Sequence, residues 1–203
     1  AFHDMVGQRR ELGLGALGLN ASQIFLAASL LNVLVAWYIF TLVPEFVMRF
    51  ITWVLVSTLY RVRADGVERI PAEGPVLLVC NHISFMDPLL LMANLRRPVR
   101  FVMYYKIFNT PLLRFVFRTA KAIPIAGHKA DPHVLQQAYD AIDDALAAGE
   151  VVCVFPEGGL TGDGDIAPFR PGVEKILARR AVPVLPMALR GLWGSMWSRH
   201  HSR

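Results

Sequence analysis

The chain has 203 residues, enough for one domain of ordinary size and a short appendage. Its formal net charge is +5, and its mean hydropathy of +0.41 is high for a soluble domain. The Lys and Arg residues stand singly or in pairs and form no dense basic face with stacking aromatics, which argues against nucleic acid as a partner. Anionic lipid headgroups or a phosphate-bearing substrate explain the charge better.

The excess of apolar residues lies near the N-terminus. No Asp, Glu, Lys or Arg occurs between Glu11 and Glu45, and residues 24–43 are almost entirely apolar. This length matches a helix that crosses ~30 Å of hydrocarbon. A buried core helix and a signal peptide are the alternatives. The apolar core of a signal peptide is usually shorter, and Trp37 and Tyr38 suit an interfacial aromatic belt, so we predict a transmembrane helix at 24–43.

A second apolar stretch covers residues 46–60 and is interrupted by Arg49. It is too short between charges to span a bilayer, and it fits a helix in the membrane interface with Arg49, Arg61 and Arg63 at headgroup level. A core helix of the globular part fits the same pattern.

These two stretches define the predicted organisation. Residues 1–61 are expected to anchor the chain in the bilayer, and residues 62–203 are expected to form the folded domain. The arginines that follow the predicted span place this domain on the cytoplasmic side by the positive-inside rule. The chain opens with Ala1 and not with Met, so we expect it to be a piece of a longer protein.

Beyond residue 62, short apolar runs alternate with longer mixed segments, which predicts an α/β fold with a mixed sheet flanked by helices. The predicted strands are 62–67, 76–80, 99–103, 122–125, 151–155 and 184–189. The predicted helices are 88–95, 132–148 and 171–180. The helix at 132–148 has the clearest signals, with Asp131 as its cap, Pro132 in its first turn and Gly149 at its end.

The two cysteines, Cys80 and Cys153, each lie within an apolar strand-like run. We expect both to be buried free thiols that pack as small hydrophobic residues. No basic group is spaced to activate Cys80 as a nucleophile, and no Cys/His spacing typical of zinc occurs. No metal site is predicted.

His82 follows the predicted strand 76–80 and precedes the helix that begins near Pro88. This is the carboxyl edge of a sheet, where α/β proteins place functional groups. A histidine that acts as a general base needs a partner to fix its tautomer, and Asp87 is spaced to turn back onto it. We therefore predict that His82 is a catalytic base and that Asp87 orients it.

A second motif, Phe155-Pro156-Glu157-Gly158, follows the strand 151–155. Pro156 ends the strand, and Gly158 permits close approach of the backbone to a ligand. Glu157 is thereby expected at the same edge as His82, where it contacts a substrate hydroxyl or a basic side chain.

The two motifs together resemble the glycerolipid acyltransferase family, which includes the 1-acylglycerol-3-phosphate acyltransferases. The resemblance extends from Arg63 to about Leu192. Its motifs are met by Asn81, His82 and Asp87, by Phe155 to Gly158, by Pro168 to Gly172, and by Val182 to Pro186.

In that family the histidine removes the proton from a glycerol hydroxyl, which attacks an acyl thioester. The resemblance therefore implies an acyltransferase whose catalytic residues are His82 and Asp87. The predicted substrate-binding residues are Asn81, Ser84, Glu157, Gly158, Lys129 and Arg170. A nucleophilic role for Ser84 is disfavoured because the chain lacks a Gly-x-Ser-x-Gly motif.

The chain departs from the family pattern at two arginines that hold a phosphate. Gly159-Leu160 stands where the family has Thr-Arg, and Ala126-Gly127 stands where it has Asp-Arg. This pattern resembles the branch that acylates 2-acylglycerophosphoethanolamine, which often follows a transporter-like membrane region. Substitute cations could come from Lys121, His128, Lys129 or Arg170.

The expected substrates are an acyl thioester, either acyl-CoA or acyl-carrier protein, and a lysophospholipid drawn from the bilayer. The expected acceptor is 1-acylglycerol-3-phosphate or lysophosphatidylethanolamine, and no cofactor is expected. Two alternatives stay open: a catalytically inactive lipid-binding module attached to a transporter, and a thioester hydrolase that uses water as the acceptor.

Overall fold

The structure is a computed structural model that describes residues 20–42, 44–128, 130–195 and 197–199. The chain forms two compact units, residues 1–44 and 45–203. The second unit begins earlier than the predicted domain boundary at residue 62, because helix α2 (Pro44–Leu59) packs on the folded domain through the buried Val56.

The first unit contains α1 (Ala21–Leu42), which covers most of the predicted span 24–43. Its N-terminus carries a reciprocal cap, because the Asn20 and Gln23 side chains each accept a hydrogen bond of 2.9 Å from the other residue's backbone N–H. Residues Ala21–Phe40 form the one described helix that is long and apolar enough to cross a membrane, and none of that stretch is buried.

The second unit is built on a parallel sheet. Its described strands are β1 (Val76–Cys80), β2 (Val99–Tyr104), β3 (Ile123–Ile125), β4 (Val151–Val154) and β5 (Val184–Met187), in the order β3-β2-β4-β1-β5. All four pairings are parallel, so the prediction of an α/β fold is confirmed and its mixed sheet is corrected. The central strands are buried on both faces, as parallel strands with helical crossovers must be.

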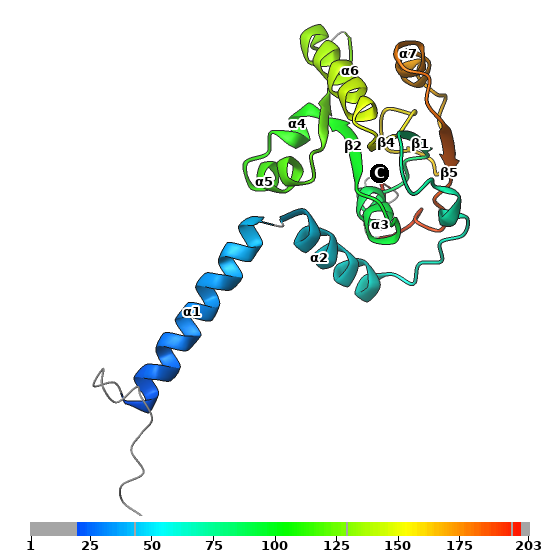
Figure 1. Cartoon of the computed structure of the whole chain (residues 1–203). Helices are drawn as coiled ribbons and strands as arrows, with labels where there is room; N and C mark the ends of the chain where they lie inside the picture. Colours follow the sequence, from blue (N-terminus) through cyan, green and yellow to red (C-terminus); the bar gives the residue numbers. More distant parts are fainter. Residues whose placement is uncertain (1–19, 43, 129, 196, 200–203) are drawn as a thin grey trace, which may run out of the picture. The chain divides into compact units, whose positions relative to one another are not determined.

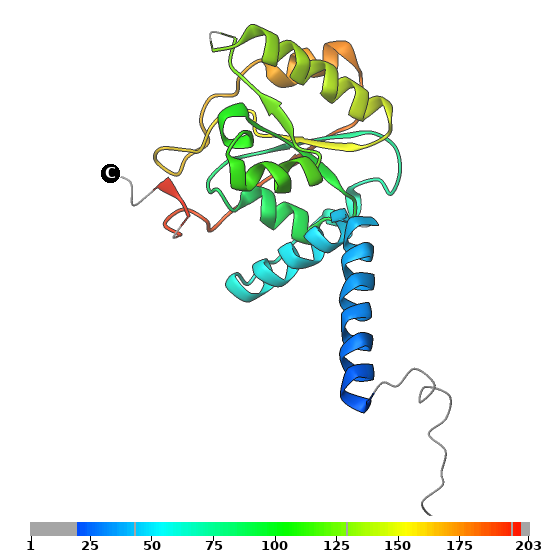
Figure 2. The ribbon, with the colours of Figure 1, turned by 90° about the vertical axis from the view of Figure 1, so that its left-hand side faces the viewer.

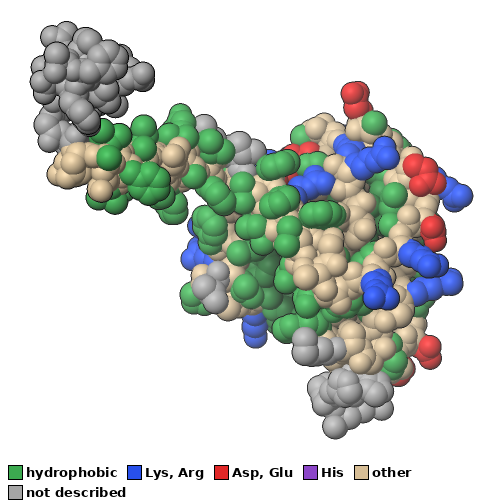
Figure 3. Space-filling model, turned by 90° about the horizontal axis from the view of Figure 1, so that it is seen from below, with side chains coloured by type: hydrophobic (Ala, Val, Ile, Leu, Met, Phe, Trp, Pro, Cys, Tyr) green, Lys and Arg blue, Asp and Glu red, His purple; other side chains and the backbone are tan. Residues whose placement is uncertain are grey.

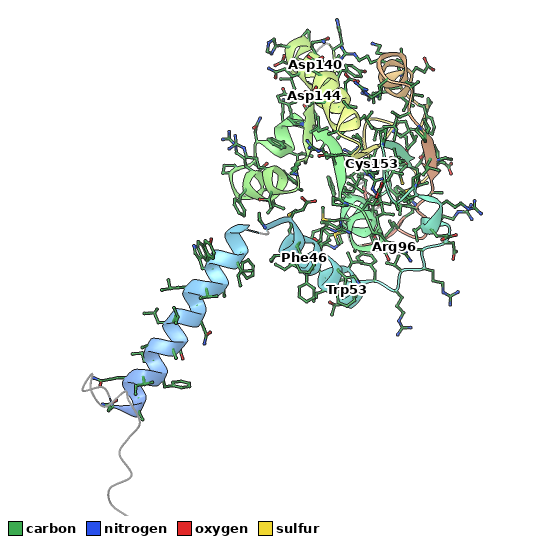
Figure 4. All side chains as sticks on the ribbon, in the orientation of Figure 1. Phe46, Trp53, Arg96, Asp140, Asp144 and Cys153 are labelled. Carbon is green, nitrogen blue, oxygen red and sulfur yellow. The ribbon has the colours of Figure 1, made fainter. Side chains whose placement is uncertain are left out.

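Helices cover both faces of this sheet (Figures 1 and 2). On one face lie α6 (Pro132–Ala147) and α7 (Gly172–Arg179), which pack with β1 and β4 through Leu77 and Val152. On the other face lies α3 (Asp87–Asn94), which packs on Leu78 and Cys153. Figure 4 shows Cys153 inside this body. The sheet is therefore the middle layer of three.

Helix α2 lies beside α3 on the second face. Its Val56 joins a buried cluster with Ile83, Met86, Leu90 and Leu192. Its other side exposes a set of large apolar side chains: Phe46, Phe50, Ile51, Trp53, Val54, Leu55 and Leu59. Apolar side chains gather on the side of the molecule seen in Figure 3. One face of α2 therefore belongs to the core of the folded domain, while the place of its exposed face in the membrane interface stays a prediction.

Several local predictions need correction. Arg49, whose place at headgroup level stays a prediction, is tied to the folded domain, because its Nη2 donates to the carbonyl oxygens of Leu95 and Arg96. The predicted strand 62–67 is wrong: residues 61–65 are exposed and pair with no strand, and a 3-10 helix (Val67–Arg69) follows. The crossover from β2 to β3 contains two unpredicted helices, α4 (Tyr105–Phe108) and α5 (Pro111–Thr119).

Candidate active site

The two predicted motifs meet at the carboxyl edge of the sheet. Strands β1 and β4 are parallel neighbours, with Val79 opposite Val154. The residues that follow each strand therefore emerge side by side, which brings the segment after Cys80 next to the segment after Val154. The predicted meeting of His82 and Glu157 is present in the structure.

His82 and Asp87 form the contact that their spacing predicts. His82 Nδ1 lies 2.8 Å from Asp87 Oδ2, and this oxygen also accepts backbone N–H groups from Ile83 at 2.6 Å and Ser84 at 3.0 Å. Asp87 Oδ2 is a carboxylate oxygen and can only accept hydrogen bonds, so the ring nitrogen that faces it must donate. Nδ1 therefore carries the ring proton of His82. The other ring nitrogen, Nε2, then has a lone pair available for base chemistry.

Asp87 is positioned by its place at the first residue of α3, with Pro88 next to it. Its side chain is 0% exposed, and its second oxygen, Oδ1, has no hydrogen-bond partner among the described residues. A carboxylate without bulk water interacts more strongly with a neighbouring imidazole. This burial suits Asp87 to hold His82 and to stabilise the imidazolium that would form on proton transfer.

The His82 ring stacks on Phe155, with ring centroids 4.1 Å apart and an interplanar angle of 18°. The His82 side chain is 18% exposed, so it remains accessible from the sheet edge. Phe155 thus contributes packing to the base, and the two motifs touch through side chains as well as through backbone.

Glu157 acts on backbone groups. Its Oε1 accepts the His82 N–H at 2.8 Å, and its Oε2 accepts the Ala167 N–H at 2.8 Å. The side chain is buried. Glu157 thereby clamps His82 and the loop 157–167 together, and its contact with a substrate hydroxyl stays a prediction.

A second clamp on His82 comes from Thr161, whose N–H donates to the His82 carbonyl oxygen at 2.9 Å. Thr161 is buried, and its hydroxyl donates to the Asp165 carbonyl oxygen at 2.7 Å. Sequence reasoning missed this residue. The sequence offered one signal: Thr161 directly follows Gly159-Leu160, where the chain departs from the family pattern.

Gly158 has φ 72°, in the left-handed region that favours glycine. A Cβ atom built there would lie 2.6 Å from Arg170 Nε, so the Arg170 side chain passes directly over this glycine. The Arg170 N–H also donates to the Pro156 carbonyl oxygen at 2.9 Å. The structure thus brings Gly158 and the exposed cation Arg170 together at the loop beside His82.

Asn81 and Ser84 both bond to backbone groups of the C-terminal part of the chain, and their substrate binding stays a prediction. The Asn81 amide exchanges two hydrogen bonds with the backbone of Leu189, at 3.0 and 2.8 Å, which joins the ends of β1 and β5. Ser84 is fully buried; its hydroxyl donates to the Trp197 carbonyl oxygen and accepts the Met86 N–H. The Ser84 hydroxyl thus links the turn before Asp87 to the C-terminal segment.

A C-terminal segment supports the turn that carries Asp87. The Trp197 carbonyl oxygen also accepts the Phe85 N–H at 3.3 Å, and Ser84 and Ser198 form an isolated antiparallel bridge. No sequence signal pointed to this contact, because the partners lie more than one hundred residues apart.

Of the predicted substitute cations, Lys129 lies outside the described residues. Lys121 precedes β3 and pairs with Glu45 at 3.9 Å, at the amino edge and away from His82. His128 follows β3 at the carboxyl edge. No group of three metal-ligating side chains was found among the residues that the structure describes.

Burial keeps both cysteines protonated. It raises the pKa of Cys80 to about 12, with the charge of Asp87 as the second cause. The Cys153 pKa lies well above its ordinary value because of burial and then because of the neighbouring Cys80. A thiol with a raised pKa is a poor nucleophile at neutral pH. Neither cysteine is therefore a candidate nucleophile, and His82 remains the candidate reacting group.

The fold and this site define an acyltransferase-type α/β domain, and comparison with known proteins agrees. A family model described as Acyltransferase matches residues 61–190, which is more than half of the chain. The chain belongs to this acyltransferase family.

Curated relatives carry more specific names. The chain is 29% identical over 133 residues to the chloroplastic 1-acyl-sn-glycerol-3-phosphate acyltransferase BAT2 of Brassica napus, covering 65% of this chain and 38% of that protein. It is 30% identical over 154 residues to a 1-acyl-sn-glycerol-3-phosphate acyltransferase of Chlamydomonas reinhardtii, covering 74% and 46%. The chain thus spans less than half the length of these two relatives.

A solved structure shares the fold. The 1-acyl-sn-glycerophosphate acyltransferase PlsC from Thermotoga maritima superposes with a TM-score of 0.53 at 21% identity, over 82% of this chain and 77% of that one. This likeness supports the architecture of the sheet and its helices.

Proposed function

We propose that this chain transfers an acyl group from an acyl thioester to the free hydroxyl of a lysophospholipid. The observation that carries the proposal is the His82–Asp87 contact of 2.8 Å, with Asp87 Oδ2 held by two further backbone N–H groups. This arrangement fixes the tautomer of His82 and leaves Nε2 to act as the base that attack by an alcohol requires.

The proposed reaction needs no covalent enzyme intermediate. His82 Nε2 takes the proton of the acceptor hydroxyl as its oxygen attacks the thioester carbonyl carbon. The resulting tetrahedral intermediate collapses, the C–S bond breaks, and the thiol leaves with the proton returned by His82. The products are a diacyl phospholipid and free thiol. Asp87 stabilises the imidazolium between these two steps.

The acyl donor is acyl-CoA or acyl-carrier protein, because either one presents the same thioester. The relatives named above are 1-acyl-sn-glycerol-3-phosphate acyltransferases, which supports a lysophospholipid acceptor. Leu160 is buried and apolar at the position where the family pattern has a cation for the phosphate. This difference favours lysophosphatidylethanolamine over 1-acylglycerol-3-phosphate as the acceptor headgroup.

The proposed location is the membrane, with the acyltransferase domain on the cytoplasmic side. Support comes from the apolar helix α1 and from the exposed apolar face of α2, whose opposite face packs against Ile83 and Met86 of the catalytic turn. A lysophospholipid that leaves the bilayer at α2 would have a short path to His82.

An acceptor panel tests the proposal. The chain in detergent micelles is given labelled acyl-CoA or labelled acyl-carrier protein. Each donor is combined with lysophosphatidylethanolamine, with 1-acylglycerol-3-phosphate, or with neither, and products are identified by mass spectrometry. Diacyl phospholipid with lysophosphatidylethanolamine is the expected product. Free fatty acid alone would indicate a hydrolase, and no product with any donor would indicate an inactive lipid-binding module. A strict preference for 1-acylglycerol-3-phosphate would contradict the proposed acceptor headgroup but not the proposed acyl transfer.

A further inference from the structure

The crossover between β2 and β3 has an unusual charge distribution. Its helices α4 and α5, with their flanks, make up residues 104–119, which we name the basic hairpin. No Asp or Glu occurs anywhere between residues 99 and 130. The hairpin carries Lys106, Arg114 and Arg118, which are all exposed, and none of the three forms an ion pair with a described residue.

The same segment exposes large apolar side chains. Phe115 is 74% exposed, and Ile107, Leu113 and Val116 are also exposed. The two helices are joined by stacked rings of Phe108 and Phe117, with centroids 6.3 Å apart. No described residue of the hairpin is fully buried. The rings of Phe108 and Phe117 thus join the two helices, and the hairpin leaves an apolar surface that no described residue covers.

The cations and the apolar residues are interleaved on α5. Arg114 and Arg118 are four residues apart and lie one above the other on the helix, where like charges repel. Phe115 is three residues before Arg118 and borders the same surface. Anions bound to this surface would offset the repulsion between Arg114 and Arg118. An apolar layer beneath those anions would bury the Phe115 ring. A bilayer with anionic headgroups offers both layers at this spacing.

The hairpin leaves the sheet at the edge that carries the active site. Strand β2 ends at Tyr104, which is also exposed, and α4 begins at the next residue. His82 follows β1 at this same carboxyl edge. In Figures 1 and 2, α4 and α5 stand at the β2–β3 side of the sheet, apart from α6 and α7.

We propose that the basic hairpin docks on an anionic lipid surface, with Phe115 in the boundary between headgroups and acyl chains. Lys106, Arg114 and Arg118 contact lipid phosphates. The segment that makes this contact is separate in sequence from the predicted membrane helix and from α2.

The test uses the full chain with a single fluorophore whose emission reports the polarity around it. Phe115→Cys is labelled with the fluorophore NBD; Cys80 and Cys153 do not compete because both are buried with raised pKa values. Gln137→Cys on α6, which is exposed on the opposite layer, is the matched control. Both proteins are reconstituted in vesicles of phosphatidylcholine with or without phosphatidylglycerol.

With phosphatidylglycerol, the label at residue 115 should shift to the blue and be quenched by doxyl-labelled lipids, while the label at residue 137 should stay aqueous. Replacing Arg114 and Arg118 by Gln should lower the docked-to-undocked ratio about fivefold for each arginine. High salt should act in the same direction.

Equal emission and quenching at residues 115 and 137 would overturn the proposal. A response at residue 115 to soluble acyl-carrier protein in detergent, with none to vesicles, would overturn it in favour of an acidic protein partner. The experiment is repeated in His82→Ala, whose label should respond as in the parent protein, so that the docking is judged apart from the proposed chemistry.

Discussion

The backbone N–H of His82 donates a hydrogen bond of 2.8 Å to the buried carboxylate of Glu157. The two motifs of this chain, some seventy residues apart, are therefore fastened together at the residue that we propose as the base. The second oxygen of Glu157 accepts the Ala167 N–H, so one side chain positions both His82 and the loop that carries Arg170.

Glu157→Gln should lower both activity and stability. Gln offers one oxygen and one NH2 group, so either His82 or Ala167 would face a donor in place of an acceptor. We expect a loss of about 1–3 kcal/mol in the free energy of unfolding, since a buried N–H is left unpaired. Denaturant unfolding and acyl-transfer rates measure the two effects. Glu73→Gln, at an exposed carboxylate, is the control, and equal behaviour of the two variants would contradict the clamp.

Asp87→Asn should keep the fold and reduce turnover. The Asn oxygen can still accept the Ile83 and Ser84 N–H groups, but the negative charge that stabilises the His82 imidazolium is lost. We expect kcat to fall by about 10²–10⁴-fold with little change in melting temperature. Asp65→Asn, at an exposed carboxylate, should match the parent protein in both measurements. A kcat within twofold of the parent would show that Asp87 is not needed.

Asn81→Ala distinguishes positioning from substrate binding. The variant leaves the Leu189 N–H and carbonyl without their side-chain partner, so the unfolding free energy should fall by about 1–3 kcal/mol. The KM for the lysophospholipid should stay near that of the parent protein. Asn109→Ala, at an exposed amide, is the control. A large rise in KM at unchanged stability would support the predicted substrate-binding role and contradict a purely positioning one.

The cysteines should lower stability at alkaline pH. The unfolded chain releases the Cys80 proton near pH 9, whereas the folded chain holds it to about pH 12. Between these values the folded state binds more protons, so the free energy of unfolding falls as the pH rises. Urea unfolding at pH 8 and pH 10.5 measures the change, and Cys80→Ser should weaken it. Iodoacetamide should not modify the native protein at pH 8; rapid native labelling would contradict the burial.

Much of the fold could be predicted from local sequence. Strands such as Val76–Cys80 are continuous apolar runs between turn residues, and α6 has its predicted cap, because the Asp131 side chain accepts the His133 and Val134 N–H groups. The prediction missed α4 and α5 because their apolar residues are exposed and do not face the core. Such predictions read apolar periodicity over windows of about 11–18 residues, whereas α4 has 4 residues and α5 has 9.

In the candidate site, too, local contacts were predicted from the sequence and long-range contacts were missed. The contact of His82 with Asp87 spans five residues of sequence, so spacing alone predicted it. The roles of Asn81 and Ser84 depend on Leu189 and Trp197, which the fold brings from the far end of the chain. Spacing carries no information on such partners, and the substrate-binding roles predicted for these two residues came from the resemblance to the family.

The most direct test of the account is the rate of acyl transfer by His82→Ala. The variant and the parent protein are compared at equal concentration, with matched melting temperatures, using labelled acyl-CoA, lysophosphatidylethanolamine and mass spectrometry of the products. The account predicts that the parent protein forms diacyl phospholipid and that the variant is slower by at least about 10²-fold. Transfer by His82→Ala at the parental rate would contradict the proposed base and with it the mechanism.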